Sequence, residues 1–443
     1  MSAGGHARSP WRKWVPAGAG VVVAAVVVLV IVLSGGSSTT NATGSNASSA
    51  ATSSGTIKLG IPIANAATLA ALGQSTRGAL SVAQTELMFS SQIDALNRSG
   101  GFGAVKVKPV FEVFSLADPA SIQRSCVALT QTQHVFAALA VQYVLGGDAC
   151  IAQHGTPMLE SVAAPQAVYD HFPGRIFTTQ MAPNVNARSF AHELVSSGSL
   201  RGQKVGVLAD SLGGDFAPVS QTLVPALRAG GIDVAHVTDL SANFSVAPQQ
   251  IPVEISDMRS AGVTTIVDAT PGPNLVLWLG GLQKAGWMPK IVMSDLNDAD
   301  FAVYTGMYPP SMAGTTAYTT QRYGEHAAGL SAPASDQTCL SRYESAGGVT
   351  LAPDSANYVE LEQTCQVLAL FADGLKAVSG SPSQTSFAKA MSGLGSVSLP
   401  FQGPSSLGAG KPYAADAVRV TRFSATAHAF VPSATSQWLP INR

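Results

Sequence analysis

The feature that most constrains the fold is a regular alternation of strand-like and helix-like segments that begins at Ile57. The first segment alternates Ile and Leu with smaller or polar residues, as a buried strand does. The helix that follows ends at a glycine pair, Gly100 and Gly101. At the next expected helix, Asp118 is placed as the N-cap and Pro119 at the first helical position. The first series contains expected strands at 57–63, 105–114, 135–140 and 156–162 and a helix at 118–133.

A second series of strand and helix segments begins near residue 183. Strands that alternate with helices build parallel sheets with helices packed on them. Two series therefore predict an α/β protein with two parallel-sheet lobes, and ligands of such sheets bind beyond the carboxyl ends of the strands. The expected strands are 204–210, 233–240, 264–269 and 290–295, and the expected helices are 186–198, 216–231, 248–262 and 274–286.

After residue 314 the regular alternation ends. One strand-like segment, 314–320, is followed by a mainly helical region, and the chain closes with a β-hairpin pattern at 416–433. The expected helices of this region lie around 336–346, 354–378 and 384–392.

The N-terminal part of the chain differs in composition from the rest. A basic tail, 1–14, precedes 19 uncharged residues, 15–33, which are long enough to cross a bilayer as a helix. The basic residues before this segment favour a cytoplasmic N-terminus and an exported body. Residues 34–56 are rich in Ser, Thr, Gly, Asn and Ala, a composition typical of a disordered linker. Two interpretations remain open, a retained membrane anchor with the folded body outside the cell membrane, or a signal peptide that is cleaved before secretion.

The overall composition limits the classes of function. The formal net charge is −1 and only 12% of residues are charged, which argues against a nucleic-acid partner. The sequence contains no C-x-x-C motif, no P-loop and no G-x-G-x-x-G motif. We therefore expect no metal site and no cofactor.

The four cysteines suggest disulfides, because an even number in an exported chain is typical of them. Three sets of pairings are open, and the spacing favours Cys126–Cys150 with Cys339–Cys365. Each of these bonds would close a loop of about 25 residues, worth roughly 3 kcal/mol of stability in the chain-entropy model.

Six segments follow one another in an order typical of one protein family. They are 57–80 (IKLGIPIANAATLAALGQSTRGAL), 93–103, 110–131, 204–234, 281–295 (GLQKAGWMPKIVMSD) and 358–380. In order and spacing they resemble the type I periplasmic binding proteins, specifically the Leu/Ile/Val-binding branch of ABC importers. The resemblance covers roughly residues 57–433. Cys126 and Cys150 also stand where members of this family often carry a disulfide.

The resemblance implies a fold of two Rossmann-like lobes joined by three hinge crossovers, which close on a ligand. Lobe 1 would comprise residues 57–180 plus 316–400. Lobe 2 would comprise residues 181–315 plus 401–443.

The resemblance also implies which loops hold the ligand. In relatives, the loop at 141–150 holds a ligand carboxylate with hydroxyl and backbone N–H groups, but the usual serine is missing here. Backbone amides could still bind an anion there. At Asp295, relatives place an acid that pairs with the ligand ammonium. The ligand-binding residues carried over are Asn65, Thr68, Tyr143, Gly146, Gly147, Ser161, Val162, Ala164, Phe216, Thr270 and Asp295.

The function implied is capture of a small ligand, an amino acid or another small and partly apolar molecule, and its delivery to an ABC permease. A tethered ligand sensor and a degenerate surface binding protein are the alternatives. A more distant alternative is a serine hydrolase, because Ala209 to Gly213 match A-x-S-x-G around Ser211. The next helix is expected only at Phe216, too late for the sharp turn of a nucleophile elbow, so we do not expect an enzyme.

Overall fold

The computed structural model describes residues 55–68, 80–115, 117–141, 143, 146–210, 216–241, 246–270, 272–294, 308–353, 355–433 and 435–441. All of them belong to one unit of the chain, Ser48–Arg443. The basic tail 1–14, the apolar segment 15–33 and almost all of the linker 34–56 lie outside these ranges. Within the described ranges, no helix combines the length and the apolarity needed to cross a membrane.

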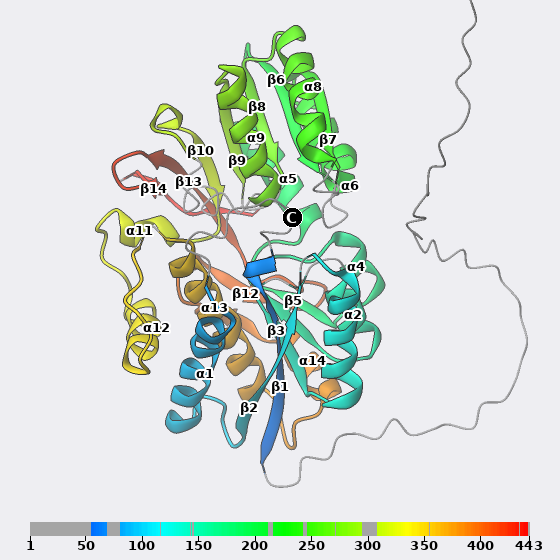
Figure 1. Cartoon of the computed structure of the whole chain (residues 1–443), viewed down its shortest axis with the longest axis vertical. Coiled ribbons are helices and arrows are strands. Elements are labelled where there is room, and N and C mark those ends of the chain that lie inside the picture. The colour runs from blue at the N-terminus through cyan, green and yellow to red at the C-terminus, as the bar shows by residue number, and fades with distance from the viewer. Residues whose placement is uncertain are drawn as a thin grey trace, which may run out of the picture. The chain divides into compact units, whose positions relative to one another are not determined.

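The first sheet contains five parallel strands in the order β2-β1-β3-β4-β5 (Figure 1). Because the strands run in the same direction, their carboxyl ends share one edge of the sheet. Four of these strands were expected from the sequence, and the short β5 was not. The strands are β1 (Thr56–Ala64), β2 (Lys106–Phe114), β3 (Ala137–Ala140), β4 (Met158–Glu160) and β5 (Ile176–Thr178).

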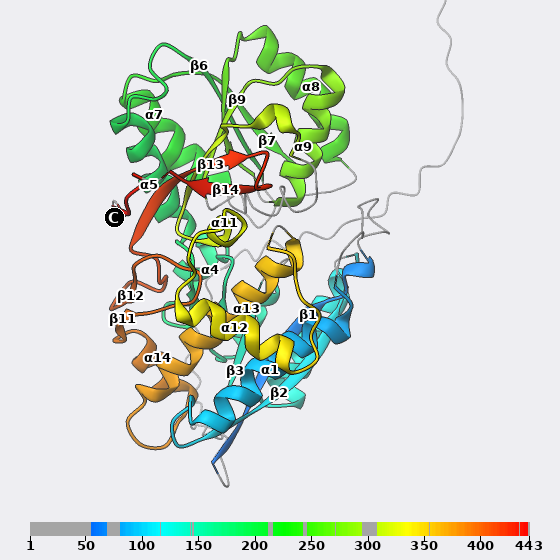
Figure 2. The same ribbon diagram turned by 90° about the vertical axis from the view of Figure 1, so that its left-hand side faces the viewer.

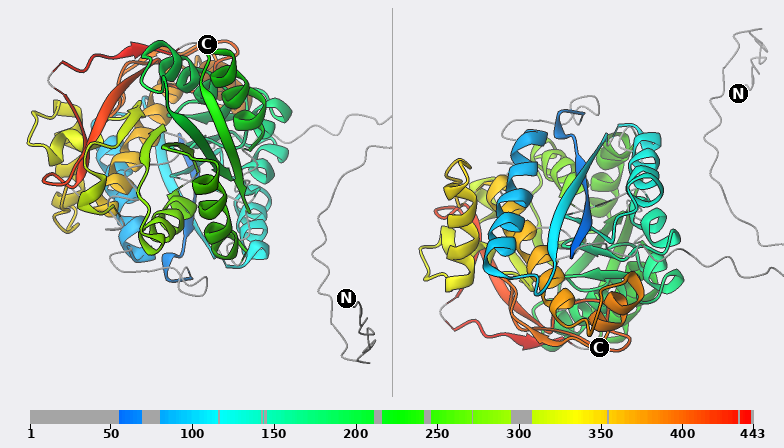
Figure 3. Two further views of the ribbon diagram at one scale, coloured as in Figure 1. Left: turned by 90° about the horizontal axis from the view of Figure 1, so that it is seen from above. Right: turned by 90° about the horizontal axis from the view of Figure 1, so that it is seen from below.

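Helices cover both faces of this sheet, because side chains alternate along each strand. On one face, Leu59 of β1 packs with Phe89 of α1 (Val82–Ser99) and Phe371 of α13 (Ala356–Lys376). Figure 3 shows the sheet edge-on between these helices and the cyan helices of the opposite face.

On the opposite face, Ala138 of β3 packs with Ile122 of α2 (Pro119–Val127) and Ile151 of α3 (Gly147–Gln153). The two faces therefore have separate cores. The remaining helices of the first sheet are α4 (Gln166–His171), which contributes to this second core, and α14 (Gln384–Met391), which contributes to the first.

The helix ends follow the chemistry expected from the sequence. The side chain of Asp118 accepts a hydrogen bond from the Ala120 amide at the start of α2. Gly100 ends α1 in the left-handed conformation with φ 72°, and its amide donates to the Leu96 carbonyl. Both predicted signals are thus confirmed.

The second sheet has the order β14-β13-β10-β9-β8-β6-β7, and β15 (Leu439–Pro440) also pairs with β13. Its central strands are parallel, whereas β13 is antiparallel to β10 and forms an antiparallel hairpin with β14 (Figure 2). The strands are β6 (Lys204–Asp210), β7 (Asp233–Leu240), β8 (Thr265–Ala269), β9 (Lys290–Ser294), β10 (Thr316–Thr319), β13 (Ala417–Ser424) and β14 (Ala429–Pro432).

The second sheet also has a core on each face. Val207 of β6 packs with Phe190 and Leu227 on one face, and Leu208 packs with Ile255 and Trp278 on the other. The helices that supply these residues are α5 (Pro183–Ser196) and α7 (Val224–Ala229) on the first of these faces and α8 (Ala247–Ser260) and α9 (Gly272–Ala285) on the second.

The chain passes between the two sheets after β5, after β10 and before β13. Two details differ from the expected lobe bounds. Strand β10 pairs with β9 and β13 of the second sheet, although 316–400 was assigned to lobe 1. Leu407 and Ala414 pack in a core of the first sheet, although 401–443 was assigned to lobe 2. The lobe bounds as a whole remain a prediction.

Both favoured cysteine pairings are confirmed. The Cys126–Cys150 disulfide joins α2 to α3, and the Cys339–Cys365 disulfide joins α12 (Ala334–Ser345) to α13. Other short elements are α6 (Phe216–Pro218), α11 (Tyr323–Ala327), β11 (Gly395–Val397) and β12 (Ser405–Leu407).

Candidate functional site

The loop after β1 forms a turn that uses its own polar groups. The Asn65 amide donates to the Phe114 carbonyl of β2 at 2.8 Å, and the Asn65 side chain accepts from the Ala67 amide at 3.1 Å. The Thr68 hydroxyl donates to the Asn65 carbonyl at 2.7 Å. Both predicted site residues therefore lie at the carboxyl end of β1, where they stabilise the loop.

Tyr143, a predicted ligand contact, lies in the core of the first sheet with only 1% of its surface exposed. Its hydroxyl donates to the Ile122 carbonyl at 2.8 Å and lies 2.5 Å from the Ser125 hydroxyl. Burial raises the pKa of Tyr143 to about 12. This side chain therefore packs the first sheet against α2, and ligand contact by it remains only a prediction.

Gly146 and Gly147 allow the chain to turn tightly over the Tyr143 ring. Gly146 has φ 83°, a left-handed conformation that glycine adopts without strain. A Cβ on Gly147 would lie 2.8 Å from the Tyr143 ring, closer than side chains tolerate. The two glycines thus have a structural reason to be present, and Gly147 begins helix α3 where the sequence suggested a loop.

The loop after β4 brings three predicted residues together. The Ser161 hydroxyl donates to the Val141 carbonyl at 2.9 Å, and the Val162 amide donates to the same carbonyl at 3.0 Å. The Ala164 amide donates to the Tyr169 hydroxyl at 3.2 Å. These donors, which the resemblance assigned to a ligand anion, are engaged within the protein.

Sequence reasoning missed two buried acids beside this loop, Glu160 at the end of β4 and Asp148 in the first turn of α3. Each has only 2% of its surface exposed. One Glu160 oxygen, Oε1, accepts from the Tyr143 amide at 3.2 Å, and the other, Oε2, has no hydrogen-bond partner among the described residues. Burial raises the pKa of Asp148 to about 6. Burial, together with the Asp148 charge, raises the pKa of Glu160 well above its usual range.

The carboxyl end of the second sheet also carries acids. Asp268 Oδ1 accepts from the Thr270 amide at 2.9 Å and from the Thr270 hydroxyl at 2.6 Å. Asp210, the last residue of β6, accepts from the Asn274 amide group at 2.7 Å. Thr270 is therefore at a strand end as predicted, and its role there is to orient Asp268.

The other predicted residues of the second lobe show little about the ligand site. Phe216 packs at the margin of a core formed with α5 and α7. Asp295 and Ser211 lie outside the described residues. The sequence could have revealed Asp210 and Asp268, because each is an acid at or next to the end of an expected strand.

Comparison with known proteins agrees with this architecture. A family model described as periplasmic binding protein matches residues 89–427, more than half of the chain. The chain belongs to the periplasmic binding protein family. The periplasmic binding protein family and the type I fold expected from the sequence are thereby confirmed, whereas the Leu/Ile/Val-binding branch remains a prediction.

Three solved structures illustrate the likeness of this binding protein to its relatives. A solute-binding protein from R. palustris, in complex with 4-hydroxybenzoate, is 14% identical with TM-score 0.64 and covers 87% of this chain and 98% of its own. A substrate-binding protein from Desulfitobacterium hafniense, in complex with Leu, is 15% identical with TM-score 0.58; the match covers 87% of this chain and 100% of that protein. A leucine-binding protein from Thermotoga maritima is 12% identical with TM-score 0.60 and covers 86% and 97%. At these identities the likeness concerns the fold. No curated protein matches the sequence.

The passages between the sheets of this binding protein are held together by buried glutamines. Gln366 of α13 donates to the Gln321 side chain, just after β10, at 2.7 Å. Gln402 donates to the carbonyl of Thr179, just after β5, at 2.5 Å. These bonds join the segment after β10 to α13, and the segment after β5 to the segment before β12.

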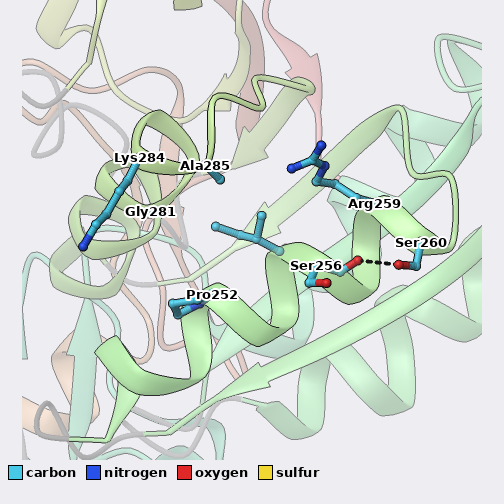
Figure 4. A pocket seen from close by; sticks show the side chains of 8 residues that line it. Pro252, Ser256, Arg259, Ser260, Gly281, Lys284 and Ala285 are labelled. Carbon is cyan, nitrogen blue, oxygen red and sulfur yellow. Dashed lines mark hydrogen bonds between the residues drawn. The ribbon is translucent and has the colours of Figure 1, made fainter.

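A groove of about 640 Å³ lies away from the strand ends, between α8 and α9. Figure 4 shows Arg259 and Ser260 of α8 and Lys284 of α9 around it. These residues lie in the last turns of their helices, which return to the amino ends of the strands. These last turns are therefore at the end of the sheet opposite to the carboxyl ends of the strands, where ligands of parallel sheets bind.

One group of potential metal ligands occurs among the described residues, Cys126, Cys150 and His154. The two sulfurs are bonded to each other, so they are not available as metal ligands. The His154 ring instead lies 3.1 Å from the Gln131 side-chain amide.

Proposed function

We propose that this protein captures a small amino-acid-like ligand between its two lobes and delivers it to an ABC importer. The observation that carries the proposal is that buried polar side chains gather at the carboxyl ends of strands in both sheets, at Glu160 and Ser161 in one and at Asp210, Asp268 and Thr270 in the other. This is the part of a parallel sheet where ligands bind.

Two further observations support capture by lobe closure. The chain crosses three times between the sheets, and the crossing segments are joined by side-chain hydrogen bonds at Gln321, Gln366 and Gln402. Lobes joined in this way can rotate about a few backbone positions while each core remains intact. Relatives crystallised with Leu and with 4-hydroxybenzoate support a small organic ligand for this chain.

The proposed site retains the sequence-based assignment of Asp295 as a ligand-binding acid of the second lobe. The loops after β1, β3 and β4 would contribute from the first lobe. The apolar segment 15–33 would anchor the protein in the cell membrane with the lobes outside it, and an ABC permease would be the partner. A retained anchor also leaves a tethered sensor as the second candidate.

The test is a thermal-shift screen of the full chain against amino acids and small organic acids and amines. Binding to the folded state raises the melting temperature, by an amount that grows with the ratio of ligand concentration to Kd. We expect at least one compound to raise it in a concentration-dependent manner. No shift from any compound at millimolar concentration would contradict the proposed function.

A further inference from the structure

The carboxyl ends of the strands are acidic in a protein whose formal net charge is only −1. Four buried carboxyl groups lie at or next to these ends, Asp148 and Glu160 in the first lobe and Asp210 and Asp268 in the second. The segments that follow β3, β4, β6 and β8, at 141–146, 161–165, 211–215 and 270–271, contain no lysine or arginine. The segment after β1 contributes one arginine, Arg77, which lies outside the described residues.

The opposite end of the second sheet has the reverse charge. Lys204 and Lys290 begin β6 and β9, and Arg259 and Lys284 lie in the last turns of α8 and α9. These four cations are thus separated from Asp210 and Asp268 by the length of the strands. Arg322 and Arg419 lie at the carboxyl end of β10, where both are ion-paired with acids. A cleft lined by one sign of charge attracts ligands of the opposite sign.

Glu160 is the acid whose surroundings point to a ligand. Its Oε1 atom accepts one backbone hydrogen bond, from Tyr143, but its Oε2 atom has no partner among the described residues. The nearby charge is that of Asp148, which is also an acid. A buried carboxyl oxygen without a donor is costly, and a hydrogen-bond donor or a cation would satisfy it.

From this arrangement we infer that the first lobe binds the cationic amino group of the ligand at Glu160 and Asp148, so that the ligand class is small organic amines without a free carboxylate. The inference rests on the proposed function and reverses the polarity that the family resemblance implied, in which the loops after β3 and β4 hold a ligand carboxylate. The other donors of these loops, at Ser161 and Val162, are already engaged by the Val141 carbonyl. A carboxylate placed there would meet two acids, Glu160 and Asp148.

The test uses pairs of probes that share a carbon skeleton and differ at one terminal group, so that only one member of each pair carries a carboxylate. Tyramine is compared with 3-(4-hydroxyphenyl)propionate, and leucinamide is compared with leucine, by calorimetric titration of the full chain. We expect each amine to bind at least tenfold more tightly than its carboxylate-bearing counterpart. The preference should fall about tenfold in Glu160→Gln, while Asp94→Asn, which neutralises an exposed acid on α1, should leave it unchanged.

A second measurement separates ligand contact from a structural role of Glu160. Amine binding should release protons, seen as a heat that depends on the ionisation enthalpy of the buffer, and Glu160→Gln should reduce this release. If Glu160→Gln does not fold, Asp148→Asn provides the same readout. Equal or tighter binding of the carboxylates would overturn the inference and leave the proposed function intact. An unchanged amine preference in both variants would also overturn it, and absence of binding by all four probes and by the wider library would overturn both.

Discussion

The carboxyl ends of β4 and β8 both carry a buried acid, yet the two acids are satisfied differently. Asp268 Oδ1 accepts two hydrogen bonds from the following Thr270. Glu160 receives one, from the Tyr143 amide, and its second oxygen has no partner among the described residues. The same topological position thus holds an acid that accepts two hydrogen bonds from its own loop in one lobe and an acid that accepts one hydrogen bond from a neighbouring loop in the other. Thr270 therefore orients Asp268, whereas among the described residues only the Tyr143 backbone amide donates to the Glu160 side chain.

The largest expected effect concerns the disulfide that ties α3, and with it Asp148, to α2. Replacing Cys126 and Cys150 by Ala should lower the free energy of unfolding by roughly 3 kcal/mol and weaken amine binding. The matched control is the pair Cys339→Ala and Cys365→Ala, which spans 26 residues rather than 24 and lies away from the acids. It should lose similar stability in urea unfolding but keep the ligand affinity. An equal loss of affinity in both double variants would contradict the comparison.

The next effect is the pH dependence contributed by Asp148. Its pKa is raised by burial from 3.8 to about 6, so the folded state holds this proton more tightly than the unfolded state. The stabilisation is therefore complete below pH 3.8 and is lost as the pH rises through about 6. Compared with the Asp148→Asn variant, the wild-type protein should lose roughly 3 kcal/mol of its free energy of unfolding between these two pH values. Urea unfolding at each pH measures this loss. A difference between the two proteins that is independent of pH would rule out this account of Asp148.

The smallest expected effects are the stability changes on altering the hydrogen bonds of Asp268 and of Glu160. Thr270→Val removes a hydroxyl that donates to buried Asp268 and should cost about 2 kcal/mol, whereas Thr270→Ser should cost less because the donor remains. Glu160→Gln should change the free energy of unfolding by less than about 1 kcal/mol. The glutamine side-chain oxygen can still accept the hydrogen bond from the Tyr143 amide, and the substitution breaks no ion pair. Chemical unfolding of the three variants checks this order. A larger cost for Glu160→Gln than for Thr270→Val would mean that Glu160 is the more tightly held acid.

The sequence predicted most of the fold because its signals are local. The capping residues Asp118 and Gly100 lie where expected, and the bounds of β6 and β7 match the expected strands residue for residue. Strand β10 was placed in the wrong lobe because strand pairing depends on distant segments, here β9 and β13.

The site was predicted less well, for the same reason. The family resemblance indicates which loops face the ligand. It does not show which hydrogen-bond donors of those loops are already bonded to other groups of the protein. Tyr143 was expected to contact ligand, yet the start of α3 at Gly147 covers its ring. Glu160 was overlooked because an acid at the end of a three-residue buried strand has no local signature. The structure shows its surroundings, which are the Tyr143 amide that donates to it and the nearby charge of Asp148.

The most direct test of the account is hydrogen–deuterium exchange of the full chain with and without a ligand found by the thermal-shift screen. If one ligand is held between the carboxyl ends of both sheets, peptides covering 141–150 and 158–166 of the first lobe and 265–275 of the second should become protected together. Protection limited to one lobe, or centred on the α8–α9 groove, would contradict it.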